Sequence, residues 1–276
     1  MNGVENGVEK IAENMLKYIS DILFYEDVYL VFDRYRKYSI KGATRAQRAK
    51  EIAYRHQLSL QGILPSKEKV LTCTQNKVQL IDLITDYLIT KIHHGKFRHV
   101  FVVTGSENVP VQVSDGNITL KEEYHTSHEE ADVILVQQCY KLLGEGSHRK
   151  LKIISDDTDV FALACFYFPV DHEDACVYME PTVKGRSIVD IGATARKHPE
   201  KIKNILQAHA ISGCDSVCKF MGIGKTKALT AMDKKTLAHL GDLDASISEV
   251  VSEATEFIGS CYNMMKGKDM SEKRYV

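Results

Sequence analysis

The stretch Leu151–Phe166, LKIISDDTDVFALACF, indicates the fold most clearly. A short apolar run ends in the acidic turn Ser155–Asp159, and a second apolar run follows at once. The first run is typical of a buried strand, whereas periodicity alone does not decide whether Val160–Phe168 is a helix or a strand. In an open α/β sheet, side chains that follow the strands gather at one edge, so this turn is a candidate site.

Other parts of the chain repeat the pattern of apolar strand and helix. Val28–Phe32 and His99–Val103 are near-continuous apolar runs, which suit a sheet that is covered on both faces. Between the strands, helices are expected over Ile11–Phe24, Ala43–His56, Lys77–Ile92, Glu129–Leu142 and Lys201–Ile211. Strands that alternate with helices predict an α/β fold with a mainly parallel central sheet.

The composition is that of a globular protein. Hydrophobic residues make up 44% and charged residues 26% of the 276 residues, which excludes a wholly disordered chain. The net charge of -1 argues against bulk basic binding to nucleic acid but leaves a local basic patch open. We expect a monomer.

The cysteines and the chain start bear on the cellular compartment. The seven cysteines are an odd number and form no Cys-x-x-Cys motif, which is typical of reduced thiols in a cytosolic or nuclear protein. No apolar run reaches the ~18–20 residues that span a bilayer, and Met1–Lys10 lacks the apolar core of a secretory signal. We therefore expect a protein of the nucleus or cytoplasm that is neither secreted nor in a membrane.

Acidic side chains recur where strands end and helices begin. They fall into four clusters: Asp33; Glu129, Glu130 and Asp132; Asp156, Asp157 and Asp159; and Asp215. Carboxylates that share one site need a cation to balance their charge, and oxygen ligands favour Mg²⁺ or Mn²⁺, as one ion or two. Helix capping is the alternative for each cluster taken alone, and helical spacing leaves Glu129 and Glu130 open as partners of Asp132.

Two further segments suit phosphate contacts. Gly222 and Gly224 form a turn that opens a helix carrying Lys225 and Lys227, although a plain helix start is the alternative. The second segment is basic, contains no acidic residue, and includes Arg34, Arg36, Lys37, Lys41, Arg45, Arg48 and Lys50. Interleaved tyrosines favour contact with nucleic acid, and a solvated helix face is the alternative.

Four segments, taken in order, resemble the PIN-like superfamily of flap-endonuclease-type 5′ nucleases, and an invertebrate-type branch of it in particular. They are VYLVFDRYRKYSIKGATRAQR, HEEADVILVQQC, KIISDDTDVFAL and HAISGCDSVCKFMGIGKTKAL. The resemblance covers about residues 26–231. It implies a three-layer α/β/α core over 26–200, preceded by a helix over 1–25 and followed by a helix–turn–helix region and tail over 201–276.

The resemblance also implies roles for particular residues. The metal ligands would be Asp33, Glu130, Asp132, Asp157, Asp159 and Asp215. Arg45 and Arg48 would face the scissile phosphate beside Asp33 as catalytic residues. The nucleic-acid contacts would come from Arg34, Arg36, Lys37, Lys41, Gly222, Gly224, Lys225 and Lys227. The expected partner is branched or duplex DNA.

The chain departs from the family at its start, because no apolar strand ending in Asp precedes Ile11–Phe24. Either the chain is N-terminally incomplete or the site has lost one ligand. The sequence therefore predicts a divalent-metal-dependent, structure-selective nuclease. The alternative is a catalytically silent nucleic-acid-binding or scaffold protein with the same fold. An ordinary hydrolase is less favoured, because no Gly-x-Ser-x-Gly elbow occurs.

Overall fold

The computed structural model describes residues 7–35, 54–146, 150–169, 174–214 and 217–263. Contacts within the chain divide it into two compact units, Met1–Leu135 and Val136–Val276, and the division falls inside one helix, α5. This division differs from the three segments expected from the sequence. In particular, the expected boundary at 200/201 falls within the short helix α8, Pro199–Ile202.

The first unit is built around a mixed four-stranded sheet in the order β1-β2-β3-β4. β1 (Val28–Val31) and β2 (Phe101–Thr104) are parallel, while β3 (Val111–Ser114) and β4 (Asn117–Leu120) continue the sheet in antiparallel register. Asp115 and Gly116 both have positive φ, as the two-residue turn between β3 and β4 requires. An Asp-Gly pair is typical of such a turn, because both residues tolerate positive φ.

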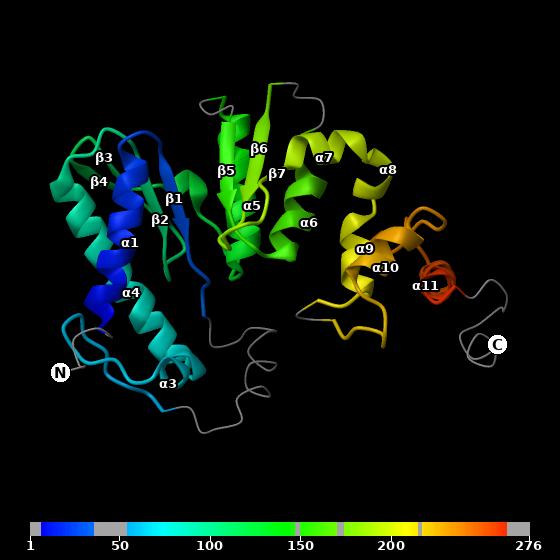
Figure 1. Ribbon diagram of the computed structural model, residues 1–276, viewed down its shortest axis with the longest axis horizontal. Helices are drawn as coiled ribbons and strands as arrows, with labels where there is room; N and C mark the ends of the chain where they lie inside the picture. Colours follow the sequence, from blue (N-terminus) through cyan, green and yellow to red (C-terminus); the bar gives the residue numbers. More distant parts are fainter. Residues whose placement is uncertain (1–6, 36–53, 147–149, 170–173, 215–216, 264–276) are drawn as a thin grey trace. The chain divides into compact units, whose positions relative to one another are not determined.

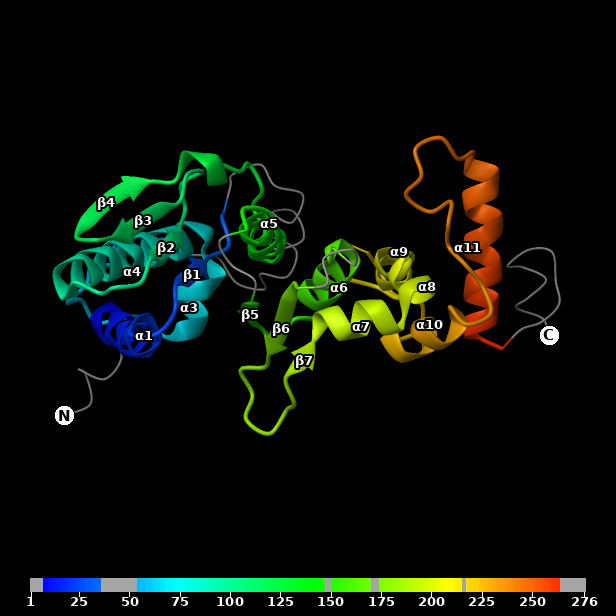
Figure 2. The same cartoon turned by 90° about the horizontal axis from the view of Figure 1, so that it is seen from above.

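Helices α1 (Val8–Leu23) and α4 (Thr74–Gly95) cover one face of this sheet (Figures 1 and 2). Leu23 and Leu88 from these helices are fully buried against Phe101 and Val103 of β2. The apolar stripe at helical spacing therefore faces the core. The unit also contains α3 (Lys67–Thr72) and a 3-10 turn over Glu122–Tyr124.

The second unit has a mixed three-stranded sheet in the order β5-β6-β7. β5 (Lys150–Ile154) is parallel to β6 (Cys176–Glu180), and β6 is antiparallel to β7 (Val189–Asp190). Its helices include the part of α5 (Ala131–Gly144) from Val136 onward, α6 (Thr158–Tyr167) and α7 (Ile191–Lys197). The segment for which the sequence left helix and strand open is thus helix α6.

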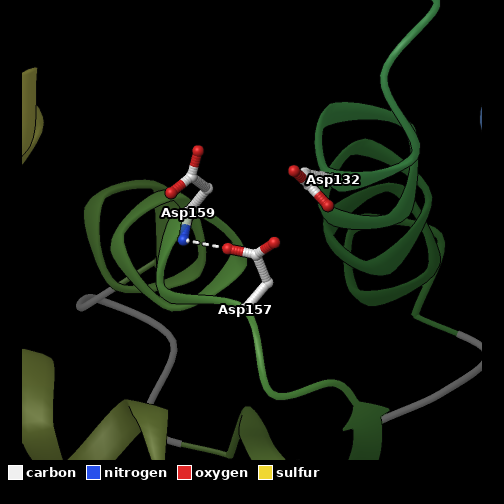
Figure 3. A group of neighbouring side chains, drawn as sticks. All are labelled: Asp132, Asp157 and Asp159. Carbon is white, nitrogen blue, oxygen red and sulfur yellow. Dashed lines mark hydrogen bonds between the residues drawn. The ribbon is translucent and has the colours of Figure 1, made fainter. Parts of the chain in front are cut away.

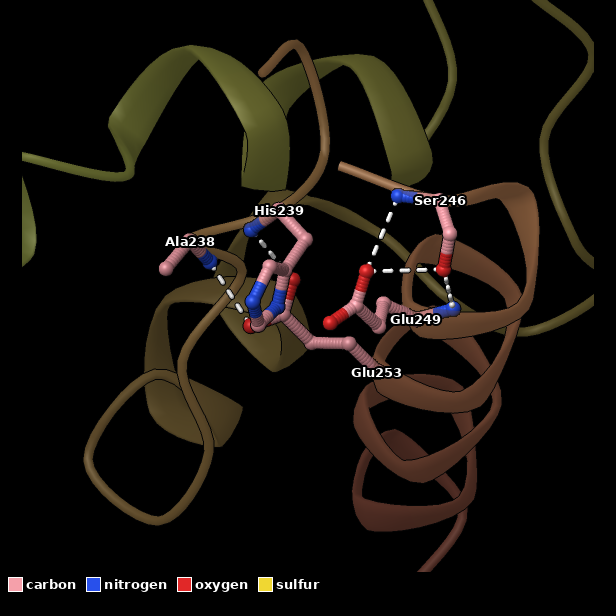
Figure 4. A network of polar contacts seen from close by, with 5 residues as sticks. All are labelled: Ala238, His239, Ser246, Glu249 and Glu253. Atoms are coloured by element: carbon pink, nitrogen blue, oxygen red, sulfur yellow. Dashed lines mark hydrogen bonds and ion pairs between the residues drawn. The ribbon is translucent and has the colours of Figure 1, made fainter. Parts of the chain in front are cut away.

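The C-terminal part of this unit is helical. α9 (Ile205–Ile211), α10 (Lys225–Ala231) and α11 (Ile247–Cys261) share a core that contains Ile223, Leu237 and Phe257. α11 begins with a reciprocal cap between Ser246 and Glu249, and Glu253 accepts hydrogen bonds from the main-chain N–H groups of Ala238 and His239, both at 2.8 Å (Figure 4). These bonds attach the preceding loop to the helix.

The α/β class that the sequence predicts is confirmed, but the sheet differs from the expectation. The described residues form two mixed sheets, and β1–β2 and β5–β6 are the parallel pairs among them. A β-hairpin such as β3–β4 needs only a short turn between its strands, so antiparallel strands are easily added at the edge of a sheet. The PIN-like three-layer arrangement stays a prediction.

The helix expected over Ala43–His56 lies outside the described residues, except for its last three, which are not helical. Among the described helices, none combines the length and the apolar character needed to cross a membrane.

Candidate metal site

The three aspartates of the acidic turn after β5, Asp156, Asp157 and Asp159, have two different roles. Asp157 is the N-cap of α6, and its carboxylate accepts a hydrogen bond from the main-chain N–H of Asp159 at 2.8 Å. Its own N–H donates to Oγ of Ser155 at 3.1 Å. Asp157 and Asp159 therefore lie at the start of α6, where the exposed N–H groups of the helix favour negative charge.

Asp156 serves the fold. Its carboxylate accepts hydrogen bonds from the main-chain N–H of Thr182 at 3.0 Å and from the Thr182 hydroxyl, and it pairs with Arg186 at 3.2 Å. The hydroxyl bond, followed by the Thr182 N–H and Arg186, lowers the pKa of Asp156 below its ordinary value, against the opposing effect of desolvation. Asp156 thus attaches the turn to the loop between β6 and β7.

Helix α5 supplies the third aspartate. Asp132 lies in its first turn, and the second half of the same helix packs on α6, where the Tyr140 hydroxyl donates to the carbonyl oxygen of Ala164. The rings of Tyr140 and Phe168 add an edge-to-face contact with centroids 6.5 Å apart. This packing holds the second half of α5 against α6, and Asp132 lies in the first turn of the same helix.

Asp132, Asp157 and Asp159 form a compact carboxylate cluster (Figure 3). One ligand oxygen from each lies within 4.8 Å of the others, with Asp157 exposed and the other two half-buried. Three carboxylates at this separation repel one another when ionised, and a bound cation relieves the repulsion. The three residues could together hold a metal ion, and all of their donor atoms are carboxylate oxygens.

His209 and Lys225 lie next to this cluster. Nε2 of His209 is enclosed 2.9 Å from Oδ1 of Asp159, although the pair is not a well-aligned hydrogen bond. Burial and the charge of Lys225 lower the pKa of His209, with Asp159 opposing them. Burial likewise lowers the pKa of Lys225, while the nearby Asp159 acts in the other direction. Sequence reasoning missed His209, because a single histidine in a helix carries no signal of its tertiary neighbours.

The end of β1 uses its acidic residue differently. Oδ1 of Asp33 accepts the N–H of Ala131 at 2.9 Å, which caps the start of α5. Among the described residues, Asp33 and Glu130 do not belong to the carboxylate cluster. The main chain of Glu129 accepts the N–H of Arg34 at 2.8 Å, so this segment joins the end of β1 to α5. Roles for Asp33 and Glu130 as metal ligands stay predictions.

Arg34 requires a correction. Its side chain is 1% exposed, and its guanidinium donates to the carbonyl oxygens of Gly105, Thr126 and His128 at 3.3, 2.7 and 3.1 Å. A buried guanidinium cannot reach the phosphates of a nucleic acid. The guanidinium instead serves as a donor to main-chain carbonyls in the interior.

Of the two lysines that follow the glycine turn, one is hydrogen-bonded to the main chain and the other is exposed. Gly222 has a φ of +72°, and Gly224 is the extended N-cap of α10. Nζ of Lys225 donates to the carbonyl oxygens of His209 and Gly213, both at 2.7 Å, whereas Lys227 is exposed. The other predicted site residues, Arg36, Lys37, Lys41, Arg45, Arg48 and Asp215, lie outside the described residues.

Comparisons of the chain with protein-family models, curated proteins and solved structures found no match. The interpretation of the site therefore depends on its own residues and their geometry.

Proposed function

We propose that this protein is a divalent-metal-dependent nuclease whose metal ligands include Asp132, Asp157 and Asp159. The observation that carries the proposal is the convergence of these three carboxylates within 4.8 Å of one another. A bound Mg²⁺ or Mn²⁺ supplies activation of water and neutralisation of the leaving oxygen in phosphodiester hydrolysis. The protein itself would hold carboxylate oxygens of Asp132, Asp157 and Asp159 close together at the starts of α5 and α6.

The sequence resemblance to PIN-like 5′ nucleases supports the same function. The clustered aspartates are three of the six carboxylates that this resemblance implies as ligands. Asp156, which the resemblance leaves out, is engaged with Thr182 and Arg186 instead. The proposed substrate is branched or duplex DNA, and the exposed Lys227 beside the Gly222 turn is suited to a sequence-independent phosphate contact.

The experiment combines metal binding with cleavage of flap and nicked duplexes and of a matched RNA. We expect wild type to cleave only with Mg²⁺ or Mn²⁺, and Asp157→Asn to reduce cleavage at least about 100-fold, because one ligand charge is lost. Asp86→Asn is the matched control, since Asp86 is an exposed aspartate of α4 outside the cluster.

Undiminished cleavage by Asp157→Asn would place the chemistry elsewhere. Metal binding by wild type without cleavage of any substrate would favour the catalytically silent binding protein instead.

A further inference from the structure

His209 places an imidazole beside one of the three clustered aspartates. It lies on α9, Asp159 lies in the first turn of α6, and the two helices pack against each other. Nε2 of His209 is 2.9 Å from Oδ1 of Asp159, and the His209 side chain is only 13% exposed. Because Asp159 belongs to the cluster, a group that restrains this carboxylate also affects how the cluster presents its oxygens.

Lys225 secures the same end of α9. Its Nζ donates to the carbonyl oxygens of His209 and Gly213, both at 2.7 Å, and Oγ of Ser212 donates to the His209 carbonyl at 3.0 Å. The last carbonyls of a helix have no partners within it, and a cation at this end is favourable. The main chain of His209 is therefore held by two side chains.

We propose that His209 is a positioning residue that holds Asp159 for divalent-metal binding, and that Lys225 supports it by fixing the end of α9. This inference rests on the metal site of the proposed function. It adds to that site one residue that contacts Asp159 from outside the cluster, His209, and one that holds His209, Lys225.

The role proposed for the imidazole is donation to Asp159 and not direct coordination of the metal. His209 does not belong to the group whose ligand atoms all lie within 4.8 Å of one another. A proton on Nε2 is present in one neutral tautomer and in the imidazolium, so the donor role does not depend on the charge of the ring. Partners that orient a ligating carboxylate in this way typically change metal affinity by about 10–100-fold.

Two substitutions at this position separate donation from space filling. His209→Gln keeps an N–H donor of similar reach, whereas His209→Leu fills the space without a donor. By titration calorimetry with Mn²⁺, we expect the Leu variant to bind about tenfold more weakly and the Gln variant to stay within about threefold of wild type. Wild-type affinity in the Leu variant, or equal losses in both variants, would overturn the proposal.

Lys225→Met tests the supporting contact. We expect a smaller loss of Mn²⁺ affinity, about threefold, because Lys225 hydrogen-bonds to the main chain at the end of α9 and not to the Asp159 carboxylate. An unchanged affinity would remove Lys225 from the proposal.

A measurement on wild type does not depend on the folding of any variant. In ¹⁵N-labelled protein, the His209 ring should carry its proton on Nε2 in the metal-free state and keep it when Mg²⁺ is added. Loss of that proton on Mg²⁺ addition would make His209 a ligand and contradict the positioning role.

The outcomes also separate this inference from the proposed function. Mn²⁺ binding that does not depend on His209 contradicts the inference alone. Mn²⁺ binding that depends on His209, without cleavage of any nucleic acid, contradicts only the nuclease function. A wild-type protein that binds no Mn²⁺ contradicts both.

Discussion

The ends of β1 and β5 look alike in sequence, since each apolar strand runs directly into aspartate, yet the structure uses the two ends differently. After β1, Asp33 accepts the N–H of Ala131, and the neighbouring Arg34 is buried among loop carbonyls. After β5, Asp157 and Asp159 meet a third carboxylate, that of Asp132. An aspartate accepts a main-chain N–H at the start of a helix at both ends, but only at the end of β5 do further carboxylates gather around it, among the described residues.

The difference shows what marks a candidate metal site. An aspartate after a strand has an ordinary structural role when its carboxylate accepts a main-chain N–H or pairs with a guanidinium. Carboxylates held close together repel one another when ionised, so a cluster of them could hold a metal ion. The same contrast occurs within the single turn after β5. The Asp156 carboxylate is bonded to Thr182 and Arg186, whereas Asp157 and Asp159 lie in the carboxylate cluster.

The largest expected effect is on the end of β1. Arg34→Met should lower the free energy of unfolding by about 3 kcal/mol, because it leaves three loop carbonyls without their buried donor. Arg186→Met is the matched control, since its side chain is 62% exposed and its pair with Asp156 should contribute less than about 1 kcal/mol. Urea unfolding followed by circular dichroism measures both, and equal effects would show that Arg34 is not a structural residue.

The next effect compares the two strand ends as metal ligands. Asn keeps the oxygen that accepts an N–H but removes the charge, so Asp33→Asn should preserve the cap and leave Mn²⁺ affinity within about threefold of wild type. Asp157→Asn should lower the affinity at least about tenfold, or roughly 1.4 kcal/mol, while metal-free stability holds or rises as repulsion is relieved. Calorimetric titration measures the Mn²⁺ affinities, and thermal unfolding measures the metal-free stability.

A matching loss of Mn²⁺ affinity in Asp33→Asn would instead make Asp33 a further ligand, as the sequence predicts, and the contrast between the two ends would be lost.

The smallest effect concerns a carboxylate with matched donors in the C-terminal helices. Hydrogen bonds from the side chain and main chain of Ser246 lower the pKa of Glu249 below its ordinary 4.5 (Figure 4). Since the folded-state pKa is the lower one, the ionised group contributes stability above the unfolded pKa, and that contribution is lost as pH falls through the folded pKa. Glu249→Gln should therefore lower the melting temperature slightly at pH 7 and not at pH 3.

Thermal scans of wild type and Glu249→Gln at both pH values make that comparison. A difference in melting temperature that persists unchanged at pH 3 would mean that ionisation of Glu249 contributes nothing.

The sequence by itself determined most of the local structure. Helices α1, α4 and α5 and strands β1, β2 and β5 lie within a few residues of the segments that periodicity predicts. The turn at Asp115 and Gly116 follows from residues that tolerate positive φ. These features depend on neighbours along the chain, so a single sequence contains the information that specifies them.

Only the tertiary structure decided which polar groups meet. Asp33 finds its donor at Ala131, 98 positions along the chain, Arg34 turns inward, and Asp159 meets His209 through the packing of two helices. A carboxylate has the same chemistry in all these settings, but whether it caps, pairs or clusters depends on distant donors and charges. Burial and hydrogen bonding across the fold set those partners, and neither is visible in the spacing of residues along the chain.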